Sequence, residues 1–428
     1  MIRHVYTLVW WLALPLVLLR LWLRGRQEPG YRRHWNERLG IYGRRAANDE
    51  PLTIWVHAVS VGETRAAEPL VDALLKQYPR GRIVLTHMTP TGRATGKSLF
   101  AKHGARLVQS YLPYDMPALV RRFIRHFEPR LCILMETEVW PNLIAGCARE
   151  RVPVVLANAR LSERSLRKAQ KLGKVMRDAA ADISLVAAQT ADDAARVRSL
   201  GAPNVAVTGS IKFDVVVPPA MVANGMRLRE AFGRQRPVLL CASTREGEEE
   251  LILDAFRDAA AVLPADTLLL LVPRHPQRFD AVEAMVRERS LAVQRRSQLG
   301  DTVDPATRVV LGDSMGEMFA YYAACDVAFI GGSLQPLGGQ NLIEAAALGK
   351  PVLIGQHTFN FAQVTEDALA AGGAARVADA ADLMAQAGQL LANDTARAAM
   401  GHHALAFADR HRGATARTIA LLPPLEQA

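Results

Sequence analysis

The chain has 428 residues, 50% of them hydrophobic and 22% charged, which excludes an intrinsically disordered protein and allows two domains with hydrophobic cores. Its formal net charge of +10 is uneven, because residues 1–45 hold nine arginines against Glu28 and Glu37, nine minus two or +7. A basic collar at one end argues against a nucleic-acid-binding stripe along the whole molecule. The four cysteines form no C-x-x-C pair, and their apolar surroundings predict buried, reduced thiols in a cytosolic setting.

The first apolar segment, residues 5–23, has Arg20 as its only charge. A helix of about twenty apolar residues can span a bilayer, so residues 1–30 are predicted to be a membrane anchor that spans the bilayer or lies deep in its interface. No small-x-small site follows Leu23, which argues against a cleaved signal peptide. The arginines after the segment outnumber Arg3 before it and place the later domains in the cytoplasm. The arginines expected to lie against anionic headgroups or an anionic lipid substrate are Arg32, Arg33, Arg38, Arg44 and Arg45.

From Thr53 onward, apolar runs alternate with amphipathic helical segments, a pattern typical of parallel sheets covered on both faces. The first series of predicted strands is 53–60, 82–88, 106–113, 131–137, 152–159, 183–189 and 205–210. The second is 237–243, 267–273, 291–295, 308–312, 326–331 and 351–355, followed by helices over 380–421. We therefore expect an α/β protein of two Rossmann-like, doubly wound domains facing a cleft, residues 31–213 and 237–428, joined by a linker over 214–236.

Ligands bind at the carboxyl ends of strands in such sheets, so the residues that follow each strand are candidates for function. Ser60, Gly62 and Glu63 follow the first strand, where a partly desolvated carboxylate can act as a general base. The alternative is an acidic residue placed in a helix's first turn by the helix dipole. After the strand at 131–137, Glu136 and Glu138 share one face of an extended segment, and at least Glu136 is expected to face the cleft.

Three further segments of the first half carry charge. The segment TPTGRATGKS is similar to a P-loop, but Thr91 stands where that motif needs glycine, which argues against ATP hydrolysis. A basic helix after the fifth strand is either a solvated face or a contact for phosphorylated lipid. In TGSIKFD, Lys212 is expected to reach across the cleft as a point charge. The polar residues of the basic segment are Asn158, Arg160, Arg164, Arg167, Lys168, Lys171, Lys174 and Arg177, against the single Glu163.

The strand ends of the second half predict a binding site for an anion. Ser243, Thr244 and Arg245 precede a helix and form a small anion cradle. Arg274 and His275 follow the next strand, and the segment GDSMGEM follows another. Because successive strand ends carry polar or glycine-rich loops, we expect them to line one crevice.

The segment 326–355 reads as strand, glycine loop, helix and strand. Its loop glycines let a ligand approach the backbone, and a helix over 341–348 would direct N–H groups and its positive dipole end at a phosphate. Glu344 in the first turn could accept hydrogen bonds from ribose hydroxyls. The alternative is that the glycines only permit tight packing. The loop residues concerned are Gly331, Gly332, Ser333, Gly338 and Gly339.

Seven motifs in colinear order resemble the 3-deoxy-D-manno-octulosonic acid (Kdo) transferases of lipopolysaccharide assembly. They are HAVSVGE, METEVWPN, LANARLS, TGSIKFD, VPRHP, GDSMGEM and GGSL…GGQNLIEAAALGKPVLIG…HTFNF. The resemblance implies a GT-B fold and a glycosyltransferase without a cofactor. It implies transfer of Kdo from CMP-Kdo to the lipid A precursor lipid IVA at the inner membrane, with release of CMP. Attack of an acceptor hydroxyl on the anomeric carbon predicts an inverting enzyme, and the missing D-x-D segment predicts metal independence.

The resemblance also implies roles for individual residues. Glu63 matches the proposed base, and Glu136 and Lys212 match positions proposed to stabilise the transition state. The implied CMP contacts are Pro273, Arg274, Met315, Gly316, Glu317, Asn341, Leu342, Ile343 and Glu344. Ser243 to Arg245 and the glycine loop complete the expected donor site, and the expected acceptor site is Ser60, Gly62, Glu138, Asn158 and Arg160.

Two positions depart from the family pattern: Gln340 replaces a usual histidine and Gln356 a common proline, and the first loses a titratable group. Two alternative functions remain from the sequence, a GT-B enzyme that uses a UDP-sugar and a non-catalytic, membrane-bound nucleotide-binding protein. A thermal-shift comparison of CMP with UDP separates the first, and steady release of CMP excludes the second. The chain has no D-x-D segment, so the metal–diphosphate clamp of the other large glycosyltransferase class is absent.

Overall fold

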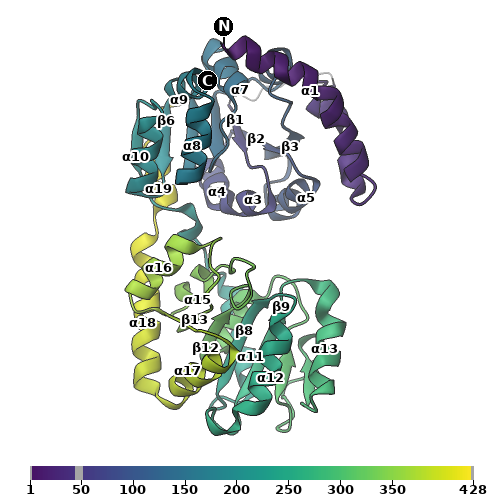
Figure 1. Cartoon of the computed structure of the whole chain (residues 1–428), viewed down its shortest axis with the longest axis vertical. Coiled ribbons are helices and arrows are strands. Elements are labelled where there is room, and N and C mark those ends of the chain that lie inside the picture. The colour runs from purple at the N-terminus through teal and green to yellow at the C-terminus, as the bar shows by residue number, and fades with distance from the viewer. Residues whose placement is uncertain (1, 44–51, 426–428) are drawn as a thin grey trace. The chain divides into compact units, whose positions relative to one another are not determined.

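The computed structural model describes residues 2–43 and 52–425, and it divides the chain into two compact units (Figure 1). Unit 1 comprises residues 1–214 together with 412–428, and unit 2 comprises residues 215–411. Arg44 and Arg45, two of the arginines expected at headgroups, lie outside the described residues. Each unit contains one parallel sheet of seven strands, which confirms the predicted α/β class.

The sheet of unit 1 has the order β3-β2-β1-β4-β5-β6-β7, and every pairing in it is parallel. This is the Rossmann order, with one added strand at the edge. The strands are β1 (Thr53–His57), β2 (Arg82–His87), β3 (Leu107–Tyr111), β4 (Leu131–Met135), β5 (Val154–Ala159), β6 (Leu185–Ala188) and β7 (Val205–Val207).

Strands β1 and β4 are buried along their whole length because helices cover both faces of the sheet. Trp55 points into one core layer, and Ile54 and Val56 point into the other. The helices of unit 1 are α1 (Ile2–Arg24), α2 (Trp35–Arg38), α3 (Val61–Ala66), α4 (Glu68–Gln77), α5 (Pro90–Leu99), α6 (Pro117–Phe127), α7 (Pro141–Arg149), α8 (Glu163–Lys171), α9 (Lys174–Ala181), α10 (Ala191–Ser199) and α19 (Ala414–Ala420), with short 3-10 helices η1 (Pro29–Arg32), η2 (Ala101–Arg106) and η3 (Ile211–Phe213).

The sheet of unit 2 has the order β10-β11-β9-β8-β12-β13-β14, again entirely parallel. Its strands are β8 (Val238–Thr244), β9 (Leu268–Pro273), β10 (Val293–Arg295), β11 (Val309–Leu311), β12 (Val327–Ile330), β13 (Val352–Ile354) and β14 (Ala374–Arg376). Its helices are α11 (Pro219–Phe232), α12 (Glu248–Asp258), α13 (Phe279–Glu288), α14 (Met318–Ala324), α15 (Ile343–Ala347), α16 (Ala362–Ala370), α17 (Ala380–Ala392) and α18 (Asp394–His411), with η4 (Ala259–Ala261), η5 (Pro276–Arg278) and η6 (Arg296–Gln298).

The boundaries between the two units differ from the domain boundaries predicted from the sequence. The expected linker over 214–236 contains helix α11, which begins with a proline at its first turn and buries Leu228 and Phe232 within unit 2. The last helix, α19, does not belong with the second half. It packs on α4 of unit 1, and the side chain of Asp214 accepts hydrogen bonds from the backbone N–H groups of Gly413 and Thr415.

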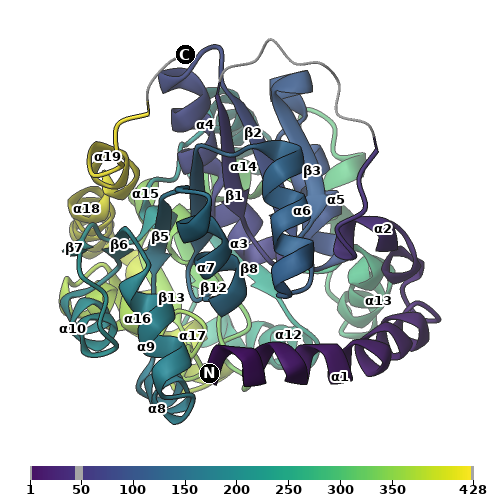
Figure 2. The ribbon, with the colours of Figure 1, turned by 90° about the horizontal axis from the view of Figure 1, so that it is seen from above.

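Helix α1 is long and apolar enough to cross a membrane, and it lies along the side of unit 1 (Figure 2). The Tyr6 hydroxyl donates to Asp115 Oδ2 at 2.9 Å, and Thr7 exchanges hydrogen bonds with the Asn142 side chain. Trp10 contacts the rings of Tyr114 and Trp140, with centroids 5.9 and 6.5 Å apart. The opposite face remains exposed and apolar, with Val5, Leu8, Val9, Leu12, Leu16, Leu19 and Leu23 on it.

Candidate functional site

Glu63 lies in the first turn of α3, directly after the carboxyl end of β1. Ser60 caps this helix: its Oγ accepts the N–H of Glu63, while Glu63 Oε2 accepts the N–H of Val59 at 2.8 Å. Ser60 is the N-cap and the Glu63 carboxylate reaches back to the residue before it, so the first-turn placement considered from the sequence is correct. It does not exclude a role as a base, because the same contacts hold the carboxylate in one position.

Burial raises the pKa of Glu63 to about 7, because desolvation disfavours the charged carboxylate. The hydrogen bond from Val59 lowers the pKa, and the nearby carboxylates Glu138 and Glu136 raise it further. Glu63 therefore exchanges its proton near neutral pH, which is where a general base works most efficiently.

Glu136, Asn158 and Lys212 form one cluster beyond β4 and β5. Lys212 Nζ lies 3.0 Å from Glu136 Oε1, and Asn158 Nδ2 donates to the same oxygen at 3.5 Å. Asn158 also positions the lysine, because its Oδ1 accepts the N–H of Ile211 in η3 at 3.1 Å. Lys212, which we expect from the sequence to reach across the cleft as a point charge, is paired with Glu136 inside unit 1.

The backbone of this cluster is not extended, contrary to the sequence-based expectation for residues 136–138. Glu136 has φ of +57° and Asn158 has φ of +54°, in the left-handed region that few side chains adopt. Such conformations cost of order 1–3 kcal/mol each and concentrate at functional sites. The turn directs Glu136 toward Asn158 and Lys212.

Glu138 lies between an indole and a buried imidazole. Trp140 Nε1 donates to Glu138 Oε2 at 2.9 Å, and the same oxygen lies 3.9 Å from His57 Nε2. Burial raises the pKa of Glu138 and lowers the pKa of His57 to about 3, so His57 is neutral at pH 7. Its Nδ1 lies 2.9 Å from Thr86 Oγ1. We did not predict His57 from the sequence; the signal was a histidine at the end of the otherwise apolar run TIWVH.

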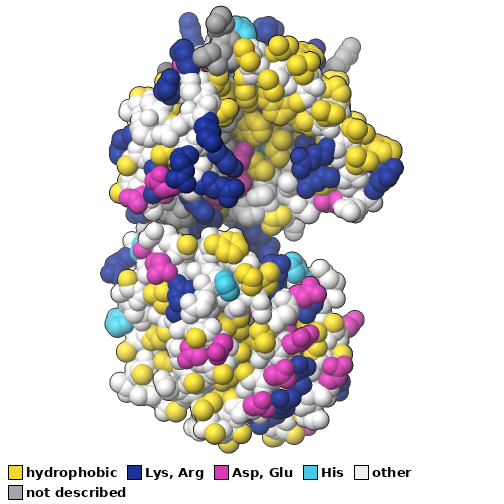
Figure 3. All heavy atoms as spheres, viewed as in Figure 1, with side chains coloured by type: hydrophobic (Ala, Val, Ile, Leu, Met, Phe, Trp, Pro, Cys, Tyr) yellow, Lys and Arg dark blue, Asp and Glu magenta, His cyan; other side chains and the backbone are white. Residues whose placement is uncertain are grey.

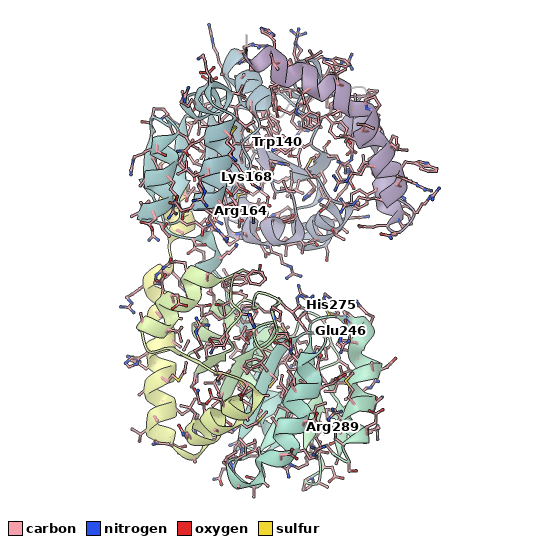
Figure 4. All side chains as sticks on the ribbon, in the orientation of Figure 1. Trp140, Arg164, Lys168, Glu246, His275 and Arg289 are labelled. Atoms are coloured by element: carbon pink, nitrogen blue, oxygen red, sulfur yellow. The ribbon has the colours of Figure 1, made fainter. Side chains whose placement is uncertain are left out.

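The other predicted residues of unit 1 surround this cluster or lie on its surface. Gly62 and Arg160 are exposed. Arg164, Arg167, Lys168 and Lys171 on α8 have no ion-pair partner among the described residues, whereas Lys174 pairs with Asp178 at 2.6 Å. Figure 4 shows Arg164 and Lys168 on α8, with Trp140 in the same unit. The arginine expected at headgroups in α2, Arg38, is buried instead, and its Nη2 donates to the Met88 carbonyl.

In unit 2 the glycine loop after β12 is organised by Glu248, a fully buried residue that begins α12. Its two carboxylate oxygens accept four backbone N–H groups, from Gly332 at 2.6 Å and from Ser333, Leu334 and Arg245 at 2.9 Å. Within the two predicted cradles, the N–H groups of Arg245, Gly332 and Ser333 are therefore not free for a phosphate. The sequence offered Glu248 only as one of three consecutive glutamates.

Tight packing explains part of the glycine pattern, as the alternative proposed. A Cβ on Gly331 would lie 2.6 Å from the Ser243 carbonyl oxygen, and one on Gly338 would lie 2.3 Å from Asn360 Nδ2. Ser243 itself has φ of +57° at the end of β8. Thr244 is buried, and its hydroxyl donates to Glu249 Oε1 at 3.2 Å.

The predicted helix over 341–348 is shorter, because α15 begins at Ile343 and ends at Ala347. Asn341 precedes it: its Oδ1 accepts the N–H of Ile343 at 3.1 Å, and its Nδ2 donates to Glu344 Oε1 at 3.2 Å. Among the described residues, no acceptor is found for the N–H groups of Asn341 and Leu342. Gln340 lies against Gly332, and Gln356 Nε2 donates to the Val377 carbonyl at 3.0 Å, a bond that proline could not form.

The remaining predicted donor residues follow β9 and β11. Pro273 ends β9, and the N–H of Arg274 donates to the Thr244 carbonyl at 2.9 Å, which ties this loop to the end of β8. His275, labelled in Figure 4, has its pKa lowered by burial and by neighbouring arginines. Met315 is 58% exposed, Gly316 has φ of +82°, and Glu317 pairs with Arg296 at 3.1 Å.

Across residues 2–43 and 52–425, no group of three or more His, Cys, Asp or Glu side chains is placed to hold a metal ion. The cysteines in this part of the chain, Cys132, Cys147, Cys241 and Cys325, are buried and free, as predicted.

The chain is similar to several known proteins. The family model described as 3-Deoxy-D-manno-octulosonic-acid transferase (kdotransferase) matches residues 33–215. A 3-deoxy-D-manno-octulosonic acid transferase of Bordetella pertussis is 47% identical over 97% of this chain and 98% of its own length. One from Haemophilus influenzae is 39% identical over 99% and 98%. UDP-GlcNAc 2-epimerase from Neisseria meningitidis, 14% identical, matches the fold with a TM-score of 0.57 over 86% of this chain and 100% of that one.

Replacing Glu248 by Gln should destabilise unit 2 by about 3 kcal/mol, because either amide orientation turns an acceptor of two N–H groups into a donor and leaves them unpaired. All six tryptophans lie in unit 1. Urea unfolding should therefore shift when followed by circular dichroism, which reports both units, and stay in place when followed by tryptophan fluorescence. Glu250→Gln, an exposed neighbour on α12, is the control and should change stability by less than about 1 kcal/mol. An unshifted circular dichroism transition in Glu248→Gln would contradict the assignment.

Proposed function

This chain belongs to the 3-deoxy-D-manno-octulosonic acid (Kdo) transferase family, and we propose that it transfers Kdo from CMP-Kdo to the lipid A precursor lipid IVA at the inner membrane, releasing CMP. The observation that carries the proposed chemistry is Glu63, a fixed, partly buried carboxylate with a pKa of about 7. It lies among Glu136, Glu138 and Lys212, at the ends of neighbouring parallel strands.

Glu63 acts as the general base. Its carboxylate takes the proton from an acceptor hydroxyl as the hydroxyl oxygen attacks the anomeric carbon of Kdo, and the bond from that carbon to the CMP phosphate breaks. The attack comes from the side opposite to CMP, so the configuration inverts. The leaving phosphate carries away the electron pair of the broken bond as CMP.

Lys212 stabilises the charge that develops as this bond breaks, and Glu136 fixes its ammonium group. The ion pair of 3.0 Å and the bonds through Asn158 hold both side chains in place before substrate binds, and preorganised charge of this kind costs no reorganisation during the reaction. Asn158 thus supports the pair, while Ser60, Gly62, Glu138 and Arg160 belong to the acceptor side.

The donor site lies in unit 2. The proposed CMP contacts are Ser243 to Arg245, Pro273, Arg274, Met315 to Glu317, the loop from Gly331 to Gly339, and Gln340 to Glu344. Since Glu248 occupies the first loop N–H groups, the phosphate is assigned to the N–H groups of Asn341 and Leu342, to which no acceptor is found within the described chain. Glu344 is the candidate for the ribose hydroxyls.

Membrane association is assigned to α1. Hydrogen bonds from Tyr6 to Asp115 and from Thr7 to Asn142 hold one face of α1 against unit 1. The other face of α1 is apolar and exposed. We therefore propose that α1 lies in the plane of the membrane interface, with the leucine face in the acyl region, rather than crossing the bilayer.

Replacing Glu63 by Gln should reduce turnover by roughly 10²- to 10⁴-fold, because the amide cannot take a proton. The measurement is release of CMP from CMP-Kdo in the presence of lipid IVA, with CMP binding followed by thermal shift. Binding should be unchanged, and the exposed Glu150→Gln on the same unit should leave turnover normal. Turnover of Glu63→Gln within a few-fold of the unchanged enzyme would remove Glu63 as the base.

The pH dependence gives a second check. Because the base must be deprotonated and the pKa of Glu63 is raised to about 7, kcat/KM should rise with pH and level off above about pH 7. Glu138→Gln removes a neighbouring negative charge, so this limb should move to lower pH. The assignment of Glu63 as the base would be contradicted if the rise of kcat/KM with pH did not shift in Glu138→Gln, or if that rise were absent while Glu63 is intact.

Activity should persist in excess chelator. A single phosphate leaving group needs less neutralisation than a diphosphate, and the N–H groups of Asn341 and Leu342 supply positive partial charge. The assay is CMP release with and without EDTA. Strong loss of activity that Mg²⁺ restores would contradict metal independence.

A further inference from the structure

Unit 1 contains a cavity of about 850 Å³ that is separate from the glutamate cluster. It lies between η1, α5 and β3, and none of Glu63, Glu136, Glu138 or Lys212 lines it. Its positively ionisable side chains are Arg33, His34, Arg93 and Lys97, and the apolar part of its wall includes Ala94 and Tyr111.

The walls of the cavity are held by specific contacts. Glu37 pairs with the guanidinium of Arg93 and accepts the N–H of Tyr111 at 2.7 Å. The Tyr111 ring contacts two arginines, with the guanidinium of Arg38 3.9 Å from its centroid and that of Arg93 at 4.9 Å. Since Arg38 is buried, this wall is preformed and does not depend on a ligand.

Two cations at the cavity have no internal counter-charge. Arg33 and Lys97 are exposed, and neither forms an ion pair with any described carboxylate, including Glu28 on the same lining. Exposed cations are common on protein surfaces and do not alone make a site. Here they border a cavity with an apolar wall, an arrangement suited to an anion attached to an apolar molecule.

The cavity directly follows the end of α1. Trp22 near this end has the guanidinium groups of Arg26 and Arg32 at 5.0 and 4.9 Å from its ring. Tryptophan flanked by arginines is typical of the membrane–water boundary. Figure 3 shows lysine and arginine side chains gathered beside the hydrophobic side chains of α1 in this unit. A membrane that takes up the leucine face of α1 would therefore bring its headgroups to this region.

We propose that the cavity binds the phosphate headgroup of an anionic membrane phospholipid. The proposal rests on the membrane association assigned to α1 above. The proposed ligand is a membrane lipid rather than the sugar acceptor because two different sides of α5 face the two sites. Gly92 packs against Val59 and Ser60, next to Glu63. Pro90, Ala94 and Lys97 line the cavity instead. Arg33 and Lys97 would neutralise the phosphate, and Tyr111 and Ala94 would contact the glycerol and upper acyl groups.

The test uses the full chain and vesicles of phosphatidylcholine, alone or mixed with phosphatidylglycerol, in a flotation assay at low salt. The double variant Arg33→Glu/Lys97→Glu should bind the mixed vesicles about tenfold more weakly, while binding to phosphatidylcholine and turnover in detergent micelles stay unchanged. The control is Arg121→Glu/Arg122→Glu on α6, which changes the net charge by the same amount at two exposed arginines of the same unit.

Three results would overturn the proposal. One is an equal loss in the control, which would indicate general attraction to the membrane. Another is unchanged binding to the mixed vesicles. The third is a raised KM for lipid IVA in micelles with normal vesicle binding, which would make the cavity an acceptor subsite. Normal turnover in micelles also shows that the double variant is folded. If the double variant does not fold, the same assay uses Arg33→Gln and Lys97→Gln, which remove each charge without reversing it. If the wild-type protein lacked transferase activity, the proposed transferase function would be contradicted, whereas the proposed lipid headgroup site would not.

Discussion

Parallel pairing of β1, β4 and β5 is the constraint on which the glutamate cluster depends. Parallel strands bring their carboxyl ends to one edge of the sheet, so Glu63, Glu136 and Asn158 meet although they are far apart in sequence. Several negative charges at one partly buried edge repel one another. The structure offsets this repulsion with the Lys212 ammonium at Glu136 and with the Trp140 and Val59 N–H groups at Glu138 and Glu63. Burial is the main cause that raises the pKa of Glu63, and the neighbouring carboxylates Glu138 and Glu136 raise it further.

In unit 2, positive partial charges rather than negative charges are brought together. The glycine loop after β12 directs several backbone N–H groups to one point, which attracts an anion. The chain supplies that anion itself, as the buried carboxylate of Glu248, and so the first part of the loop is structural. The N–H groups of Asn341 and Leu342, further along the chain, have no acceptor among the described residues. Each unit thus has a buried or partly buried carboxylate after a strand. In unit 1 it is Glu63, whose pKa is raised, and in unit 2 it is Glu248, which holds the glycine loop.

Much of this fold could be predicted from the sequence, because strands buried on both faces are continuous apolar runs. Only β14 was missed, since AAR has no β-branched or aromatic residue. The two prolines at 218 and 219 predict a linker, but proline at a first turn favours a helix, and α11 begins at Pro219. The pairing of Lys212 with Glu136, the turn at Glu136 and the role of Glu248 could not be predicted, because each depends on a contact between residues distant in sequence. The motifs predict which residues form the site, and long-range contacts determine which of their polar groups are already paired.

The path of the chain through unit 1 affects how the protein is made. Residues 412–428 complete a unit whose other part ends at Asp214, and α19 packs on α4. During synthesis from the amino end, every residue of unit 2 leaves the ribosome before the segment that unit 1 still lacks. Unit 2 can therefore fold first, while unit 1 waits with part of α4 uncovered. A chain truncated near its carboxyl end would damage the domain that begins the sequence, and the exposed leucine face of α1 belongs to that same late-maturing domain.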